Sequence, residues 1–156
     1  MYKNVIVDGP VGVGKTSVVN RLTMSLSKLN KRVEYRWRDR PVISLIEEAN
    51  ASEGVAFDGG FLADRVYRAM DGDYFGGKDD VALNPKTLVV LVTMDWRGLA
   101  ERTKGDPGKV REIVERFFEE YVAAEAPEKM ILDVGKLPAN VAVQHLMWAL
   151  GQPVRR

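Results

Sequence analysis

The sequence contains no cysteine and only one histidine, His145, in 156 residues. The lack of cysteine excludes disulfide bonds and thiolate-bound metals, and one histidine is too few for a multi-histidine metal site. The formal net charge of +1 gives no overall electrostatic basis for binding nucleic acid or a membrane surface. No apolar run approaches the roughly 20 residues of a membrane span, and no signal peptide precedes the first apolar segment. We therefore expect a cytoplasmic protein without a membrane partner.

The rest of the composition is that of an ordinary globular chain. Hydrophobic residues make up 46% and charged residues 29%, which is enough apolar material for one well-packed core. The sequence shows no internal repeat and no domain linker. We therefore expect a single domain over residues 1–156.

The clearest motif lies near the start of the chain. Residues 9–16 read GPVGVGKT and match the phosphate-binding pattern G-x-x-x-x-G-K-[ST] at every fixed position. Residues 5–7 are apolar and predict a buried strand before the motif, whereas the apolar spacing after Thr16 predicts a helix. A strand, a glycine loop and a helix, in that order, are the context in which this motif binds phosphate.

The residue types in this loop fit a nucleoside triphosphate. Glycines let consecutive backbone N–H groups point inward, and the following helix presents its positive N-terminal end. Lys15 is expected to reach the β- and γ-phosphates, and the Thr16 hydroxyl to ligate Mg²⁺. We therefore predict ATP and Mg²⁺ as ligands. The predicted ATP-binding residues are Gly9, Val11, Gly12, Val13, Gly14, Lys15, Thr16 and Ser17.

Apolar patterning predicts strands that alternate with helices. Strands are expected over 3–7, 32–37, 54–57, 87–93 and 130–132, and helices over 14–29, 42–50, 61–70, 96–102, 109–124 and 137–150. This alternation favours parallel pairing through right-handed crossovers, with helices on both faces of the sheet. Asp95 is the expected N-cap of the helix over 96–102. Residues 71–86, rich in glycine and aspartate, are expected to form a mobile loop, and residues 103–108 a polar loop.

Several charged residues follow the ends of the predicted strands. They are Asp8, Asp58, Asp95 and the arginines Arg36, Arg38 and Arg40. Ligands of parallel sheets bind at the carboxyl ends of the strands, so these side chains are expected to converge on the phosphate loop. A strand that continues to Trp37 would place the three arginines on one face.

The chain resembles the P-loop nucleotide kinases, most closely the thymidylate kinases and deoxynucleoside kinases. Residues 8–16 (DGPVGVGKT) resemble the E-G-P-x-G-x-G-K-T opening of the thymidylate kinases. Residues 57–60 (FDGG), followed by Tyr67, resemble their strand ending in D-R-Y and the tyrosine on the next helix. Residues 92–95, followed by Arg102, resemble the strand and helix that lead into their lid. The resemblance implies a three-layer P-loop NTPase fold with a five-stranded parallel sheet and a short lid near 103–108.

The chain departs from that family at defined positions. Val11 stands where many thymidylate kinases carry an acidic residue, and Gly59 stands where their D-R-Y arginine lies. Residues 103–106 make a very short lid with few basic groups. The resemblance therefore leaves the identity of the acceptor open.

The leading hypothesis is an ATP- and Mg²⁺-dependent kinase that phosphorylates a (deoxy)nucleoside monophosphate. Phosphoryl transfer needs positioning and charge neutralisation, which are the roles expected of Lys15 and Arg102. Asp58 is expected to hold Mg²⁺ or to orient the acceptor. The predicted acceptor-binding residues are Arg36, Arg38, Arg40, Arg65 and Tyr67, with Arg68 as a further candidate. Tyr67, Trp37 and Phe61 are the candidates for stacking on the acceptor base. Lys104 is expected to join Arg102 as a lid charge that neutralises the transferred phosphoryl group.

Other functions remain open from the sequence. If the acceptor is a hydroxyl of a nucleoside or of a modified base in DNA, Asp39 or Asp58 would accept its proton. A small-metabolite kinase and a non-catalytic nucleotide-binding switch are further alternatives, although the N-K-x-D motif of GTPase switches is absent. The sequence also leaves a homodimer open.

Overall fold

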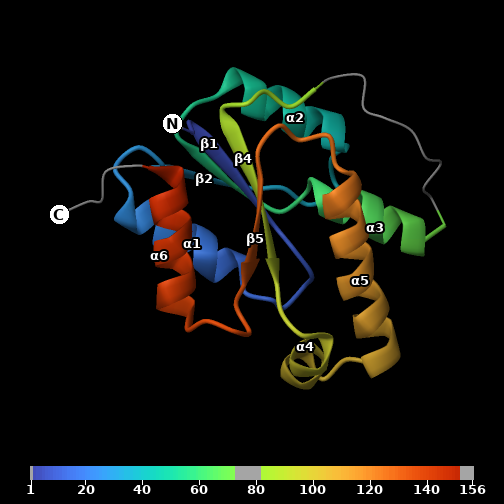
Figure 1. Ribbon diagram of the computed structural model, residues 1–156. Coiled ribbons are helices and arrows are strands. Elements are labelled where there is room, and N and C mark those ends of the chain that lie inside the picture. The colour runs from blue at the N-terminus through green and yellow to red at the C-terminus, as the bar shows by residue number, and fades with distance from the viewer. Residues whose placement is uncertain (1, 73–81, 152–156) are drawn as a thin grey trace.

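The computed structural model describes residues 2–72 and 82–151 and shows a parallel sheet with helices on both faces (Figure 1). The five strands lie in the order β2-β3-β1-β4-β5. The strands are β1 (Asn4–Asp8), β2 (Lys31–Glu34), β3 (Val55–Asp58), β4 (Thr87–Thr93) and β5 (Lys129–Asp133). The helices are α1 (Lys15–Ser25), α2 (Val42–Ala51), α3 (Leu62–Met70), α4 (Trp96–Thr103), α5 (Pro107–Ala123) and α6 (Ala139–Leu150). The expected three-layer α/β fold with a five-stranded parallel sheet is confirmed.

Two hydrophobic cores lie on opposite faces of the sheet. Alternate residues of the central strands, such as Val5 and Val90, pack against α1 and α6, which Figure 1 shows side by side. The intervening residues, such as Ile6 and Leu91, pack on the other face with side chains of α2, α3 and α5. Each fully buried aliphatic side chain stabilises the fold by about 1.5–3 kcal/mol. Because both faces are covered, β4 is apolar through most of its length.

The second strand is shorter than predicted. β2 ends at Glu34 rather than at Trp37, because β3, its neighbour among the described strands, ends at Asp58. The last hydrogen bond between the two strands runs from Tyr35 N to the Asp58 carbonyl (2.9 Å). Gly59 and Gly60, which follow β3 and have positive φ, then turn the chain away from the sheet. The predicted period-two alignment of Arg36, Arg38 and Arg40 is therefore wrong. These arginines lie in the turn after β2, where the Arg36 carbonyl accepts bonds from Asp39 N and Arg40 N.

Two helix boundaries also differ from the prediction. Helix α1 ends at Ser25, earlier than the expected 29, because the backbone N–H groups of residues 30 and 31 both donate to the Gly54 carbonyl and direct the chain into β2. Helix α5 begins at Pro107, because Asp106 caps it by accepting a bond from Lys109 N at 2.9 Å. The expected polar loop over 103–108 is thereby reduced to residues 104–106.

Most of the expected mobile loop over 71–86 lies outside the described residues. Within residues 2–72 and 82–151, no helix has the length and apolar character needed to cross a bilayer.

Candidate functional site

The phosphate loop between β1 and α1 has a backbone that requires glycine. Gly9, Gly12 and Gly14 have φ values of 152°, 85° and 104°. A Cβ atom on Gly9 would lie 2.3 Å from the Val92 carbonyl oxygen, and one on Gly12 would lie 2.4 Å from a methyl group of Thr103. The loop is thus packed closely against β4 and α4, and α1 begins directly after it at Lys15. This arrangement places the positive end of a helix at the loop, as anion binding requires.

Lys15 and Thr16 are held at the mouth of this loop. The Lys15 ammonium donates to the carbonyl oxygens of Gly9 (2.8 Å) and Pro10 (3.3 Å). The Thr16 hydroxyl donates to Asp58 Oδ2 at 2.9 Å, and the Arg32 guanidinium donates to the same oxygen at 2.9 Å. The structure therefore joins Thr16 to Asp58, the two side chains that the sequence assigned to the metal.

The chemistry of this pair fits Mg²⁺. Mg²⁺ prefers oxygen ligands and binds through one or two carboxylates together with substrate phosphates and water. Asp58 is 5% exposed, and its carboxylate lies beside the Thr16 hydroxyl at the phosphate loop. Among the described residues, no group of three or more acidic, histidine or cysteine side chains could hold a metal by itself. The residues present thus fit a metal that is shared with the phosphates of a nucleotide.

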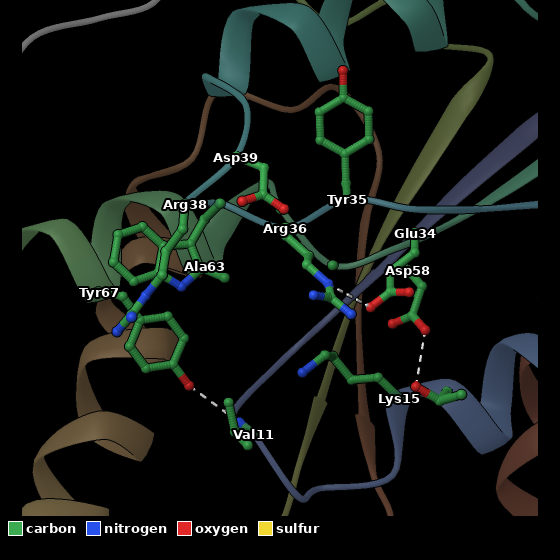
Figure 2. A pocket seen from close by; sticks show the side chains of 14 residues that line it. Val11, Lys15, Glu34, Tyr35, Arg36, Arg38, Asp39, Asp58, Ala63 and Tyr67 are labelled. Carbon is green, nitrogen blue, oxygen red and sulfur yellow. Dashed lines mark hydrogen bonds and ion pairs between the residues drawn. The ribbon is translucent and has the colours of Figure 1, made fainter.

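A cavity of about 340 Å³ opens next to Lys15, between the phosphate loop, the turn after β2 and helix α3 (Figure 2). Its charged lining residues are Lys15, Arg36, Arg38, Glu34, Asp39 and Asp58. The positive and negative side chains are equal in number, so the charges of the lining are close to balanced. Figure 2 shows Arg36 and Glu34 meeting at one side of this cavity, with the side chain of Lys15 close by.

Glu34 is the functional candidate that the sequence analysis missed. It is the last residue of β2 and pairs in register with Asp58, so both side chains leave the same face of the sheet. Its carboxylate accepts a bond from Arg36 at 3.2 Å, and both side chains are more than half exposed. A surface pair of this kind contributes at most about 1 kcal/mol, so Glu34 can exchange Arg36 for another partner at little cost.

The predicted acceptor arginines lie in different surroundings. Arg36 and Arg38 line the cavity, and Arg38 lies 5.0 Å from the centre of the Trp37 ring. Arg40 is outside the lining, 5.1 Å from the Tyr35 ring and 3.9 Å from Glu48. Arg65 is also outside the lining and pairs with Glu120 of α5 at 4.0 Å. Arg68 donates to Asp64 and to the Trp37 carbonyl, so it holds the turn after β2 against α3.

Aromatic side chains form the far wall of the cavity. Tyr67 stacks on Trp37 at 5.6 Å between ring centres and meets the edge of Phe117 at 5.7 Å. The Tyr67 hydroxyl accepts a hydrogen bond from Val11 N at 3.1 Å, which joins α3 to the phosphate loop (Figure 2). Phe61, which the sequence offered for base stacking, is instead a buried member of the core.

A buried carboxylate makes a second link between the loop and α3. Asp8 is fully buried and accepts bonds from the backbone N–H groups of Gly9, Leu62 and Ala63. Burial raises the pKa of Asp8, while the charge of Lys15 and these N–H groups act in the opposite direction. Asp8 thus satisfies the N-terminal N–H groups of α3 and fixes that helix to the loop. Asp95 is the N-cap residue of α4 as expected, but its side chain makes no capping bond.

A smaller cavity of about 160 Å³ lies beside the phosphate loop, with Gly14 and Ser17 in its lining. Its lining is mostly apolar and includes Val13, Val18, Val134 and Val143, with Arg21 and Arg102 as its charged residues. Arg102 donates to the Val13 carbonyl at 3.3 Å, so it lies against the phosphate loop rather than over Lys15. A flat apolar group with a charged phosphate tail could fill this space and still reach the loop.

Comparison with solved structures shows which fold this is. The YorR protein of Bacillus subtilis, solved in complex with phosphorylated GDP, is 17% identical with a TM-score of 0.75, over 95% of both chains. A thymidylate kinase from Candida albicans is 15% identical with a TM-score of 0.67, over 96% of this chain and 91% of that one. A deoxyadenosine kinase from M. mycoides with bound dCTP is 12% identical with a TM-score of 0.65, over 95% of this chain and 98% of that one.

No family model and no curated protein matches the sequence. The likeness is therefore one of fold: the chain shares the fold of solved kinases over nearly its whole length. One of these neighbours is named for a nucleoside and another for a nucleotide, so the fold does not fix the acceptor.

Proposed function

We propose that the protein is a Mg²⁺-dependent kinase that transfers the γ-phosphoryl group of ATP to a hydroxyl group of a nucleoside-type acceptor. The observation that carries this proposal is the position of Glu34. Its carboxylate lines the cavity next to Lys15 and emerges beside Asp58, whose own carboxylate is engaged by Thr16. The Asp58 carboxylate would thus help to hold the metal, and the Glu34 carboxylate is available to the acceptor.

The donor side follows from the phosphate loop. Backbone N–H groups and Lys15 would hold the β- and γ-phosphates, and the base would enter the apolar cavity beside Val13 and Arg102. Mg²⁺, held by Thr16 and, directly or through water, by Asp58, would neutralise charge on the phosphate oxygens. Lys15 already points along the loop toward the cavity, so only its bonds to two carbonyl oxygens must be exchanged for phosphate oxygens.

A hydroxyl acceptor requires a proton acceptor, which a monophosphate does not. As the acceptor oxygen forms its bond to the γ-phosphorus, the bond from that phosphorus to the bridging oxygen breaks, and ADP leaves with the electron pair. The hydroxyl proton passes to the Glu34 carboxylate, which lies at the cavity wall. Asp39, also in the lining, is the second carboxylate that could take this role.

The charge of the cavity also favours a neutral acceptor. A monophosphate would bring two negative charges to a site where Glu34 and Asp39 offset Arg36 and Arg38. A neutral hydroxyl meets no such repulsion. The second candidate, a nucleoside monophosphate, is supported by the two arginines of the lining, since guanidinium groups bind phosphate in a bidentate manner.

A transfer screen with γ-labelled ATP and Mg²⁺ tests the proposal. The acceptors are nucleosides, deoxynucleoside monophosphates, and DNA with ordinary or hydroxymethylated bases, and shikimate and gluconate represent small metabolites. We expect label on a hydroxyl of a nucleoside, free or within DNA. Label on a monophosphate would favour the second candidate. Bound ATP with no transfer to any acceptor would contradict both candidates and favour a nucleotide-binding switch.

Replacing Arg102 with alanine should weaken the donor side alone. The substitution removes the cation from the apolar cavity and its bond to the Val13 carbonyl. We expect the KM for ATP to rise about tenfold, as for the loss of one hydrogen bond to a charged group, and the KM for the acceptor to stay unchanged. Steady-state kinetics with each substrate varied in turn would show this. Arg116→Ala, which removes a partly exposed arginine of α5 paired with Glu112, is the matched control. A rise in the acceptor KM instead would mean that Arg102 faces the acceptor.

A further inference from the structure

The contact between Tyr67 and Val11 has no part in the proposed transfer through Lys15, Asp58 and Glu34. Val11 N donates to the Tyr67 hydroxyl at 3.1 Å, across 56 positions of the sequence. Val11 belongs to the phosphate loop, where inward-pointing N–H groups bind phosphate oxygens. In this structure the Val11 N–H meets a phenol oxygen, and Val11, Lys15 and Tyr67 all line the same cavity. The Tyr67 hydroxyl therefore lies between the phosphate loop and that cavity. Figure 2 shows it facing the same space as the Lys15 ammonium.

The phenol has both a fixed position and a proton to donate. A tyrosine hydroxyl carries one donor and two acceptor lone pairs, and the Val11 N–H occupies only one lone pair. Stacking on Trp37 and the edge contact with Phe117 fix the ring. Burial raises the pKa of Tyr67, the charge of Asp8 adds to this effect, and the Val11 N–H opposes it. The hydroxyl therefore remains protonated at neutral pH.

We propose that the Tyr67 hydroxyl donates a hydrogen bond to the γ-phosphoryl group of ATP while it accepts one from the Val11 N–H. This inference rests on the proposed function and adds Tyr67 to the residues that contact the transferred phosphoryl group. The sequence analysis placed Tyr67 against the acceptor base, but Trp37 and Phe117 already contact its ring. Negative charge is spread over the oxygens of the transferred group, so a fixed neutral donor near Lys15 would stabilise the transition state.

Nucleotide binding gives the direct test. The affinities of Tyr67→Phe for ADP and for β,γ-imido-ATP are compared with those of the unchanged protein by calorimetry. The phenylalanine ring keeps the stacking contacts and removes only the hydroxyl. We expect the affinity for β,γ-imido-ATP to fall about tenfold, as for a bond to a charged group, and the affinity for ADP to stay the same. Tyr121→Phe, a change on α5 away from the cavity, should alter neither affinity.

Two results would overturn this role. An equal loss of affinity for both nucleotides would show that Tyr67 only supports the loop, and no loss for either would show that its hydroxyl does not reach the γ-phosphoryl group. Where transfer is measurable, Tyr67→Phe should lower kcat about tenfold without raising the acceptor KM. A rise in the acceptor KM alone would return Tyr67 to the acceptor. If the unchanged protein transfers to no acceptor, the proposed function fails, while the comparison of ADP with β,γ-imido-ATP still decides the role of Tyr67.

Discussion

Replacing Lys15 with alanine should lower phosphoryl transfer by about a thousandfold or more, the loss expected when a fixed cation is removed from the transferred group. The ammonium of Lys15 lies at the mouth of the phosphate loop, within 2.8 Å of the Gly9 carbonyl, and lines the acceptor cavity. It is thus the cation that can contact the transferred group from the donor side. Its loss leaves charge on the γ-phosphate oxygens unbalanced in the transition state.

The fold should survive this substitution. Lys15 is the first residue of α1, its side chain is only partly buried, and the core residues of that helix are Val18, Val19 and Leu22. Thermal unfolding followed by circular dichroism should therefore give nearly the same midpoint for Lys15→Ala and the unchanged protein. Lys109→Ala, which removes an exposed lysine at the start of α5, controls for the lost charge and should keep full activity. Full transfer by a folded Lys15→Ala would contradict the kinase proposal.

The donor half of the site was predictable because its residues are close in sequence. The spacing of Gly9, Gly14, Lys15 and Thr16 sets the loop by itself, and the apolar residues around it identify the strand and the helix. The partnership of Thr16 with Asp58 was predictable for another reason: a residue that ends a parallel strand lies at the same edge as the loop. The 2.9 Å bond between them agrees with that reasoning.

The acceptor half was less predictable because its geometry depends on contacts between distant elements. The length of β2 depends on its neighbour, so the three arginines that appeared to share one face lie in a turn, and Glu34 becomes the strand end. The alternation of Arg32 and Glu34 around Val33 was the available signal. It places both side chains on the face of Asp58, to which Arg32 donates.

The arginines of α3 show a second limit. Arg65 and Arg68 are one helical turn apart, and either could replace the missing arginine of the D-R-Y pattern. In the structure Arg65 pairs with Glu120 of α5, whereas Arg68 is held by Asp64 and donates to the Trp37 carbonyl. Helical phase alone does not separate these outcomes, because the packing of α5 and of the β2 turn decides which arginine meets a partner.

Replacing Glu34 with glutamine should lower the rate of transfer to a hydroxyl acceptor by about a hundredfold or more, the usual contribution of a general base to the rate. The amide keeps the size of the side chain and can still accept a bond from Arg36, but it cannot take the acceptor proton. Steady-state kinetics should show a loss in kcat with little change in either KM. Glu112→Gln, which alters another exposed glutamate paired with an arginine at 3.0 Å, is the matched control and should retain full activity.

Two companion variants separate a base from a residue that only positions Arg36. If Glu34 acts only through Arg36, then Arg36→Gln should lose as much activity as Glu34→Gln. If Glu34 is the general base, the loss in Arg36→Gln should be clearly smaller than the loss in Glu34→Gln. Asp39→Asn tests the other carboxylate of the cavity: if its loss exceeds that of Glu34→Gln, the proton goes to Asp39. Near-normal transfer by both Glu34→Gln and Asp39→Asn would remove the need for a base. An acceptor that is already ionised would explain such a result, and Arg36 and Arg38 would then be its phosphate clamp.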